Sequence, residues 1–279
     1  MLATPLKSQI NKTIACAVTL LMTGIVASKA NAADWSDTSI GYRYGSKFAE
    51  PYNPEDISKN IFNLTHVSGY KYGSNYFNID LLQSDSKDSN AQEAYVVYRN
   101  TLDLGKVTGK SLGFGPVRGV GITAGFDWNT KNDTGYASKK RMLVIGPTLM
   151  IDVPGFLDVS LLLLQESNFP IGVTSRYTYD IHPMLSAAWG IPIGTSGFSF
   201  EGYMNYIASK GKNEYGGPTS PETNIDAMVM YDVGTALGIG KNTLKAGFEY
   251  QYWRNKFGNP SQVPGSLAKT PMARIEYHF

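Results

Sequence analysis

Asp180-Ile181-His182 is the arrangement in this sequence best suited to acid–base chemistry. A spacing of two places the carboxylate and the imidazole on one face of a strand, as a general base with an orienting acid requires. A membrane protease built on such a pair would need two further acids at similar spacing on an opposing strand. Asp85 and Asp88 are instead three residues apart in a loop-like segment, and Pro183 makes a turn at a strand end an equally good explanation.

A lipid hydrolase would need a serine, a histidine and an orienting amide close together. Asn63, His66 and Ser68 are the candidates, but they share one short stretch whose strand phase is ambiguous. The other histidines, His182 and His278, are far away in the sequence, and there is no H-E-x-x-H motif. We therefore expect no metal, no cofactor and no enzymatic activity, with an enzyme kept as an alternative.

The C-terminal segment indicates what kind of element carries such residues. Its apolar and polar residues alternate, so that one face of a strand would be apolar and the other ionisable. This suits a barrel with a wet lumen and a lipid-facing wall. The apolar face would hold Ala273, Ile275, Tyr277 and Phe279, and the polar face Arg274, Glu276 and His278.

The N-terminal segment is typical of a secretory signal peptide. Lys7 and Lys12 precede an apolar stretch over residues 14–27, and Ala30-Asn31-Ala32 supplies a cleavage site. The alternative, a membrane anchor helix, is disfavoured because the stretch is short and polar for a span of ~20 residues. The single cysteine, Cys16, would be removed with the signal, which excludes disulfides and cysteine nucleophiles from the mature chain.

Composition supports one membrane barrel rather than a nucleic-acid-binding protein. Residues 1–32 contain three lysines and no acid, and without them the net charge of +2 falls to about zero. The chain has 18 Tyr, 12 Phe and 29 Gly, which provide interfacial aromatics and turn formers. No later apolar run approaches the ~18 residues of a membrane helix. We expect residues 1–32 to be a signal peptide and residues 33–279 to form an outer-membrane β-barrel.

Strand-length segments recur along the mature chain, each alternating or enriched in apolar residues. They predict an all-β fold, a single antiparallel transmembrane β-barrel of about 12 strands, with 10 or 14 also possible. The segments are Ser39–Ser46, Asn60–Tyr70, Tyr76–Gln83, Glu93–Leu102, Val120–Asn129, Arg141–Val153, Phe156–Glu166, Tyr179–Trp189, Phe198–Ala208, Ile225–Val233, Leu244–Trp253 and Ala273–Phe279.

The connections between these segments alternate in length. The short ones are Lys71–Asn75, Pro154-Gly155 and Gly194–Gly197; Gly105–Val117 is an exception, long where a short turn is expected. This alternation of long loops and short turns is typical of a bacterial outer-membrane barrel with both termini in the periplasm. A secreted β-sandwich is the soluble alternative. The long polar connections are Lys47–Lys59, Asp85–Gln92, Thr130–Lys140, Ser167–Ser175, Lys210–Glu222 and Asn255–Thr270.

The inward faces of these strands carry both signs of charge together with aromatic and amide groups. This mixture favours a passive channel for small neutral polar solutes, because a phosphate or anion pore would need a ladder of Lys and Arg. The rings and amides suit a flat polar solute such as a nucleoside or a sugar, and a closed structural or receptor barrel is the non-transporting alternative. The predicted solute-contacting residues are Arg43, Tyr76, Asp80, Tyr95, Arg99, Asp127, Glu201, Tyr203, Asp232, Glu249, Trp253 and Arg274. The expected partners are outer-membrane lipids, nucleoside-like solutes and the barrel assembly machinery, with no nucleic acid.

Several stretches of the chain are distinctive: Asp34-Trp35-Ser36-Asp37 with Ile40–Phe48, Gly125-Phe126-Asp127-Trp128-Asn129, Gly146–Glu166 with its Val153-Pro154-Gly155-Phe156 turn, and the terminal Tyr277-His278-Phe279. Together they resemble the Tsx-like nucleoside-specific channel family. The resemblance covers nearly the whole mature chain. It implies a twelve-stranded outer-membrane barrel that passes nucleosides and deoxynucleosides by diffusion through weak internal sites. It assigns no individual binding residue.

Overall fold

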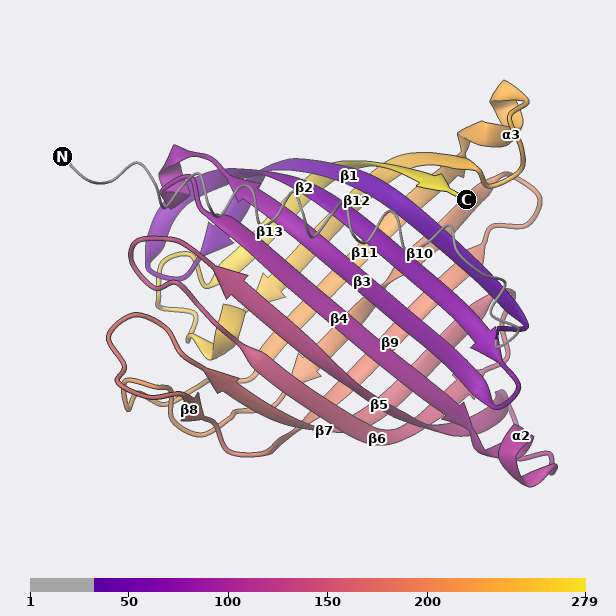
Figure 1. The fold of residues 1–279 in the computed structure, drawn as a ribbon, viewed down its shortest axis with the longest axis horizontal. Coiled ribbons are helices and arrows are strands. Elements are labelled where there is room, and N and C mark those ends of the chain that lie inside the picture. Colours follow the sequence, from indigo (N-terminus) through magenta and orange to yellow (C-terminus); the bar gives the residue numbers. More distant parts are fainter. Residues whose placement is uncertain (1–32) are drawn as a thin grey trace. The chain divides into compact units, whose positions relative to one another are not determined.

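The computed structural model describes residues 33–279, which form one antiparallel sheet (Figure 1). The predicted signal peptide and cleavage site lie outside the described residues. Two 3-10 turns, η1 (Ser86–Asp88) and η2 (Lys256–Gly258), and two helices, α2 (Leu104–Thr108) and α3 (Val233–Leu237), lie between strands. The strands are β1 (Trp35–Glu50), β2 (Asn53–Tyr70), β3 (Gly73–Ser84), β4 (Gln92–Asp103), β5 (Val117–Lys131), β6 (Arg141–Ile151), β7 (Phe156–Asn168), β8 (Tyr177–Thr178), β9 (His182–Pro192), β10 (Phe198–Ile207), β11 (Glu222–Asp232), β12 (Leu244–Arg254) and β13 (Leu267–His278).

The sheet closes on itself. Apart from the short β8, each strand pairs with the next strand along the chain, and β1 pairs with β13 through contacts such as Tyr42 opposite Ile275. Strand β8 is not a further wall strand, because it pairs with β7 just beyond the end of β9 and so prolongs β9 across a break at residues 179–181. The prediction of a twelve-stranded antiparallel barrel is therefore confirmed. The sandwich alternative is wrong, since the strands form one closed sheet.

Alternation along the strands sorts side chains between the two faces, as β5 illustrates. Ile122, Phe126 and Trp128 are exposed on the outer face, whereas Asp127 and Asn129 are buried on the inner face. The described residues contain no helix long and apolar enough to cross a membrane. Because side chains alternate in this way, the outer wall is apolar and aromatic and the interior is polar.

The connection between β1 and β2 differs from the prediction. The sequence predicts a long loop over Lys47–Lys59, but the chain reverses within residues 51–52, where Tyr52 takes a left-handed φ of 69°. Both strands continue because Phe48 and Ile57 pack together in a buried apolar cluster. The charged residues that resemble a loop in sequence instead belong to the sheet.

The irregular segment Gly105–Val117 contains α2 and no further wall strand. Asp103 caps α2 by accepting a hydrogen bond from the backbone N–H of Lys106, and Gly109 ends it in the left-handed conformation. Asp232 and Gly238 repeat this arrangement around α3. Both helices protrude from the end of the barrel where the C-terminus lies (Figure 1). We call this the turn end and the opposite end, which carries η1, β8 and η2, the loop end.

The C-terminal strand provides a test of membrane assembly. Phe279 is exposed on the outer face and stacks with Tyr277, while its backbone N–H donates to the carbonyl of Thr38 at 2.9 Å. Replacing Phe279 with Ser, or Tyr277 with Asp, should sharply reduce the amount of heat-modifiable barrel in outer-membrane fractions. The transfer penalty near the interface is only ~0–1 kcal/mol, so loss of an assembly signal would be the main cause. Replacing the outward Tyr44 with Ser is the control. Normal levels of the Phe279 and Tyr277 variants would contradict the prediction.

Candidate functional site in the barrel lumen

The strand register determines which side chains face the lumen. In β3 and β4, Asp80 lies opposite Tyr95 and Tyr76 opposite Arg99, and directly paired residues point to the same face. Following the pairs around the barrel places all twelve predicted solute-contacting residues on the inner face. These twelve residues are Arg43, Tyr76, Asp80, Tyr95, Arg99, Asp127, Glu201, Tyr203, Asp232, Glu249, Trp253 and Arg274. Their role in binding a solute remains a prediction.

The centre of this face is an alternating chain of charges. Glu249 accepts from Arg43 through Oε1 at 2.8 Å and from Arg274 through Oε2 at 2.6 Å. The other guanidinium nitrogen of Arg43, Nη2, contacts Asp80 at 2.6 Å, and Arg274 also pairs with Glu276. All five side chains lie mostly away from solvent, where an unpaired charge would be costly. Each arginine therefore holds two carboxylates in place along the wall.

A second group of paired charges lies on β4 and β5. Arg99 forms an ion pair with Asp127, and the hydroxyl of Tyr95 donates to the same carboxylate at 2.7 Å. Elsewhere on the inner face, Lys245 pairs with Glu201 at 3.1 Å. Cations and anions of the inner face thus neutralise one another locally, with no one-sided ladder of either sign.

Uncharged polar groups fill the spaces between these pairs. Asn224 donates to the hydroxyl of Tyr203 at 3.4 Å, and Gln251 donates to Asp226 at 3.3 Å. The side-chain Oδ1 atoms of Asn224 and Asp226 are buried and have no protein hydrogen-bond partner among the described residues. Tyr76 keeps 40% of its surface exposed although it points inward. Of these groups, the exposed ring of Tyr76 can stack on a polar solute.

Two of the predicted residues lie at the ends of the lumen rather than near its centre. Asp232, at the turn end, accepts from the backbone N–H and the hydroxyl of Thr235, so its carboxylate is occupied in capping α3. Trp253, at the loop end, donates from Nε1 to Glu222 at 3.2 Å and packs edge-on against Phe257. Strand alternation alone cannot separate such structural partners from the central groups, because both face inward.

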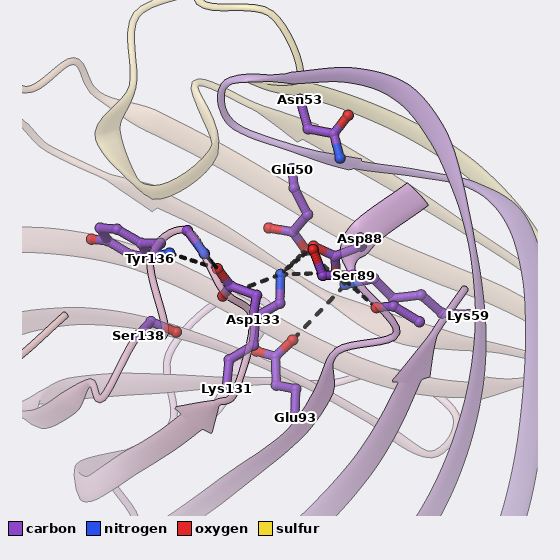
Figure 2. A network of polar contacts seen from close by, with 12 residues as sticks. Glu50, Asn53, Lys59, Asp88, Ser89, Glu93, Lys131, Asp133, Tyr136 and Ser138 are labelled. Atoms are coloured by element: carbon purple, nitrogen blue, oxygen red, sulfur yellow. Dashed lines mark hydrogen bonds and ion pairs between the residues drawn. The ribbon is translucent and has the colours of Figure 1, made fainter. Parts of the chain in front are cut away.

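A layer of buried lysines at the loop end was not predicted. On one side, Lys59 contacts Glu50 at 2.6 Å and Lys131 contacts Asp88 at 2.9 Å, with Glu93 close to Lys59 (Figure 2). The sequence-based prediction places all five lysines of this layer in loops. The phase of β5, which places Asp127 and Asn129 inward, would have predicted the inward position of Lys131. The five buried lysines are Lys59, Lys131, Lys140, Lys210 and Lys256.

On the other side of this layer, Lys210 lies between two glutamates. Its ammonium contacts Glu166 at 2.7 Å and Glu222 at 3.2 Å, while Lys140 reaches Glu166 at 3.3 Å. Burial acts to lower the pKa of Lys210, but the attraction of both carboxylates outweighs it, so the pKa is raised above its usual value. Lys140 also lies 3.8 Å from the ring centroid of Phe257, which joins connection 132–140 to connection 255–266.

Glu214 forms another junction between connections of the loop end. It accepts hydrogen bonds from the hydroxyl of Tyr179, at 2.5 Å, and from that of Tyr136. Burial, followed by the negative charges of nearby glutamates, raises the pKa of both tyrosines, which keeps them neutral donors at physiological pH. Three separate connections are thereby held together at the mouth of the barrel.

The proposed acid–base pairs are not assembled in the described chain. His182 is 1% exposed, and its Nδ1 contacts the backbone carbonyl of Asp180 at 2.7 Å, whereas the Asp180 side chain is exposed. Asn63 and His66, three residues apart on β2, point to opposite faces, and His66 contacts the hydroxyl of Thr38 at 2.8 Å. Within residues 33–279, no three His, Cys, Asp or Glu side chains are arranged to hold a metal ion.

Comparison with known proteins gives likeness to solved structures alone. No family model and no curated protein matches the sequence. The KdgM porin is 12% identical, with 86% of this chain and 99% of that chain covered and a TM-score of 0.44. The NanC porin is 9% identical, with 87% and 99% covered and a TM-score of 0.46. The translocator domain of the autotransporter NalP from Neisseria meningitidis is 10% identical, with 98% and 97% covered and a TM-score of 0.39.

The closed sheet, the apolar aromatic wall and the polar interior define the class of protein. The chain is a twelve-stranded transmembrane β-barrel of the kind found in bacterial outer membranes. What such a barrel does depends on its own lumen and loops.

Proposed function

We propose that the barrel is a passive channel of the bacterial outer membrane for small neutral polar solutes, with nucleosides favoured. The observation that supports this most directly is the local neutralisation of the inner charges around Glu249. A wall whose charges cancel has little preference for either sign of ion. The groups left to interact with a solute are aromatic rings, hydroxyls and amides.

Nucleosides suit these groups because their bases are flat and carry hydrogen-bond donors and acceptors. Tyr76 offers an accessible ring that points into the lumen. Stacking on an aromatic side chain contributes ~1–3 kcal/mol per base. The resemblance of the sequence to Tsx-like nucleoside channels favours the same solutes. Insertion by the barrel assembly machinery and contact with outer-membrane lipids belong to this proposal.

Conductance across a planar bilayer tests the proposal. Millimolar adenosine or thymidine should reduce a small single-channel conductance, whereas glucose should leave it unchanged. Tyr76→Ala should weaken the block by nucleosides about tenfold, in keeping with the loss of one stacking contact. The matched control is Tyr44→Ala, which removes an exposed tyrosine from the outer face.

Other outcomes would support other functions. Equal permeation of all small solutes would indicate a general pore. Absence of conductance together with a hydrolytic activity abolished by His182→Ala would indicate an enzyme. An unchanged nucleoside block in Tyr76→Ala would remove this tyrosine from the site.

A closed structural or receptor barrel is the second candidate, and the loop end favours it. The contact between Lys140 and Phe257 and the junction at Glu214 tie connections together over the mouth. Lys140→Ala combined with Phe257→Ala should increase conductance if these contacts restrict the channel. A protein that conducts in neither form would support the closed barrel.

A further inference from the structure

A row of outward side chains crosses four strands at the loop end. Trp128 of β5 lies opposite Arg141 of β6, which lies opposite Ser167 of β7, which in turn lies opposite Thr178 of β8. These strands run side by side at that end of the barrel (Figure 1). Arg141 is exposed on the outer face, at the loop-end start of β6. This is where lipid headgroups meet an outer-membrane barrel.

A second arginine reaches the same row from the connection before β8. Nη1 of Arg176 donates to the carbonyl of Lys139 at 2.7 Å and contacts the hydroxyl of Ser167 at 3.4 Å. Within residues 33–279, neither Arg176 nor Arg141 forms an ion pair with an acid. Partial burial and the nearby positive charge of Arg141 lower the pKa of Arg176. Two guanidinium groups thus converge beside Ser167 without a counter-ion.

On the turn-end side of the arginines, the outer surface is apolar and forms a groove. Phe126 and Leu143 occupy the next outward row, and Leu143 is 60% exposed. A groove of about 470 Å³ runs between these residues and the two arginines. Asp127 and Glu166 border the groove, but their carboxylates pair inside the lumen with Arg99 and with Lys140 and Lys210. The outer surface of the groove is therefore cationic toward the loop end and apolar toward the turn end.

We propose that this groove, formed by β5, β6, β7 and the connection before β8, binds the phosphorylated headgroup of an anionic glycolipid of the outer leaflet. Guanidinium groups form paired, charge-assisted hydrogen bonds with phosphate oxygens. Exposed Phe126, Leu143 and Trp128 would lie against the acyl chains and the interface. A free phosphate ion would use only the arginines, whereas the lipid uses both parts of the groove.

Native mass spectrometry of the full barrel in neutral detergent tests this site, with diphosphorylated lipid A as the probe. The double variant Arg141→Gln with Arg176→Gln should lose about tenfold or more in lipid affinity. Arg118→Gln is the matched control, because Arg118 is exposed at the turn end of β5 and already faces Asp158 at 3.8 Å. Heat-modifiable migration on a gel should show that every variant is folded.

The remaining arms distinguish the lipid from its parts. A dephosphorylated glycolipid with the same acyl chains should bind the wild type and the double variant equally weakly. Inorganic phosphate alone should not displace lipid A. The proposal would be overturned by unchanged lipid A affinity in the double variant, by an equal loss in Arg118→Gln, or by displacement with inorganic phosphate, which would indicate a simple anion site.

Discussion

Replacing Lys210 with methionine is expected to lower the free energy of unfolding by about 3 kcal/mol. Lys210 is 2% exposed and its ammonium lies between Glu166 and Glu222, so its removal leaves two buried carboxylates short of a counter-ion. Glu166 retains Lys140, but within residues 33–279 Glu222 keeps only the neutral donors of Trp253 and Phe257. Urea unfolding of the barrel in lipid vesicles measures the change.

Two further variants separate a charge effect from a general loss of packing. Adding Glu222→Gln to Lys210→Met should restore part of the stability, because it removes the carboxylate that has lost its cation. Lys241→Met, in the exposed connection of the turn end, should leave the unfolding midpoint unchanged. Equal stability of wild type and Lys210→Met would show that the buried lysine layer contributes little.

The arrangement of the wall could be predicted because strand alternation is a local property. In β12, Leu244, Phe248 and Tyr250 alternate with Lys245 and Glu249, and this pattern alone assigns the two faces. The pairing of neighbouring strands then brings residues of one face together, which is why all twelve predicted residues lie inside. Their individual contacts, such as Glu249 between two arginines, depend on register and shear that the sequence does not reveal.

The loop end was harder to predict because its chemistry contradicts its composition. Lys59, Lys131 and Lys210 lie in polar stretches typical of solvated loops, yet they are buried with carboxylates. A charge run has the same composition whether it faces water or pairs with acids from distant strands. The short helices could have been found, because Asp103 and Gly109 recur as Asp232 and Gly238 in a cap pattern.

The balance of the central charges should keep the channel unselective between cations and anions, and removing one of these charges should make it selective. Glu249→Gln keeps the shape of the side chain but leaves Arg43 and Arg274 with one carboxylate fewer between them. We therefore expect the channel to become anion-selective, with a change in the permeability ratio of the order of tenfold, because a lumen concentrates ions of opposite charge. The reversal potential of single channels in a potassium chloride gradient measures this ratio.

Arg274→Gln should shift the reversal potential in the opposite direction, since it leaves Glu249 and Glu276 with excess negative charge. Glu55→Gln, which removes an exposed carboxylate from β2 near the loop end, is the control and should have a small effect that salt abolishes. Screening is weaker for buried pairs, so the shifts of the two central variants should persist at high salt. Shifts of the same sign in Glu249→Gln and Arg274→Gln would mean that these variants act by distorting the barrel, and that the balanced charges around Glu249 do not set its selectivity.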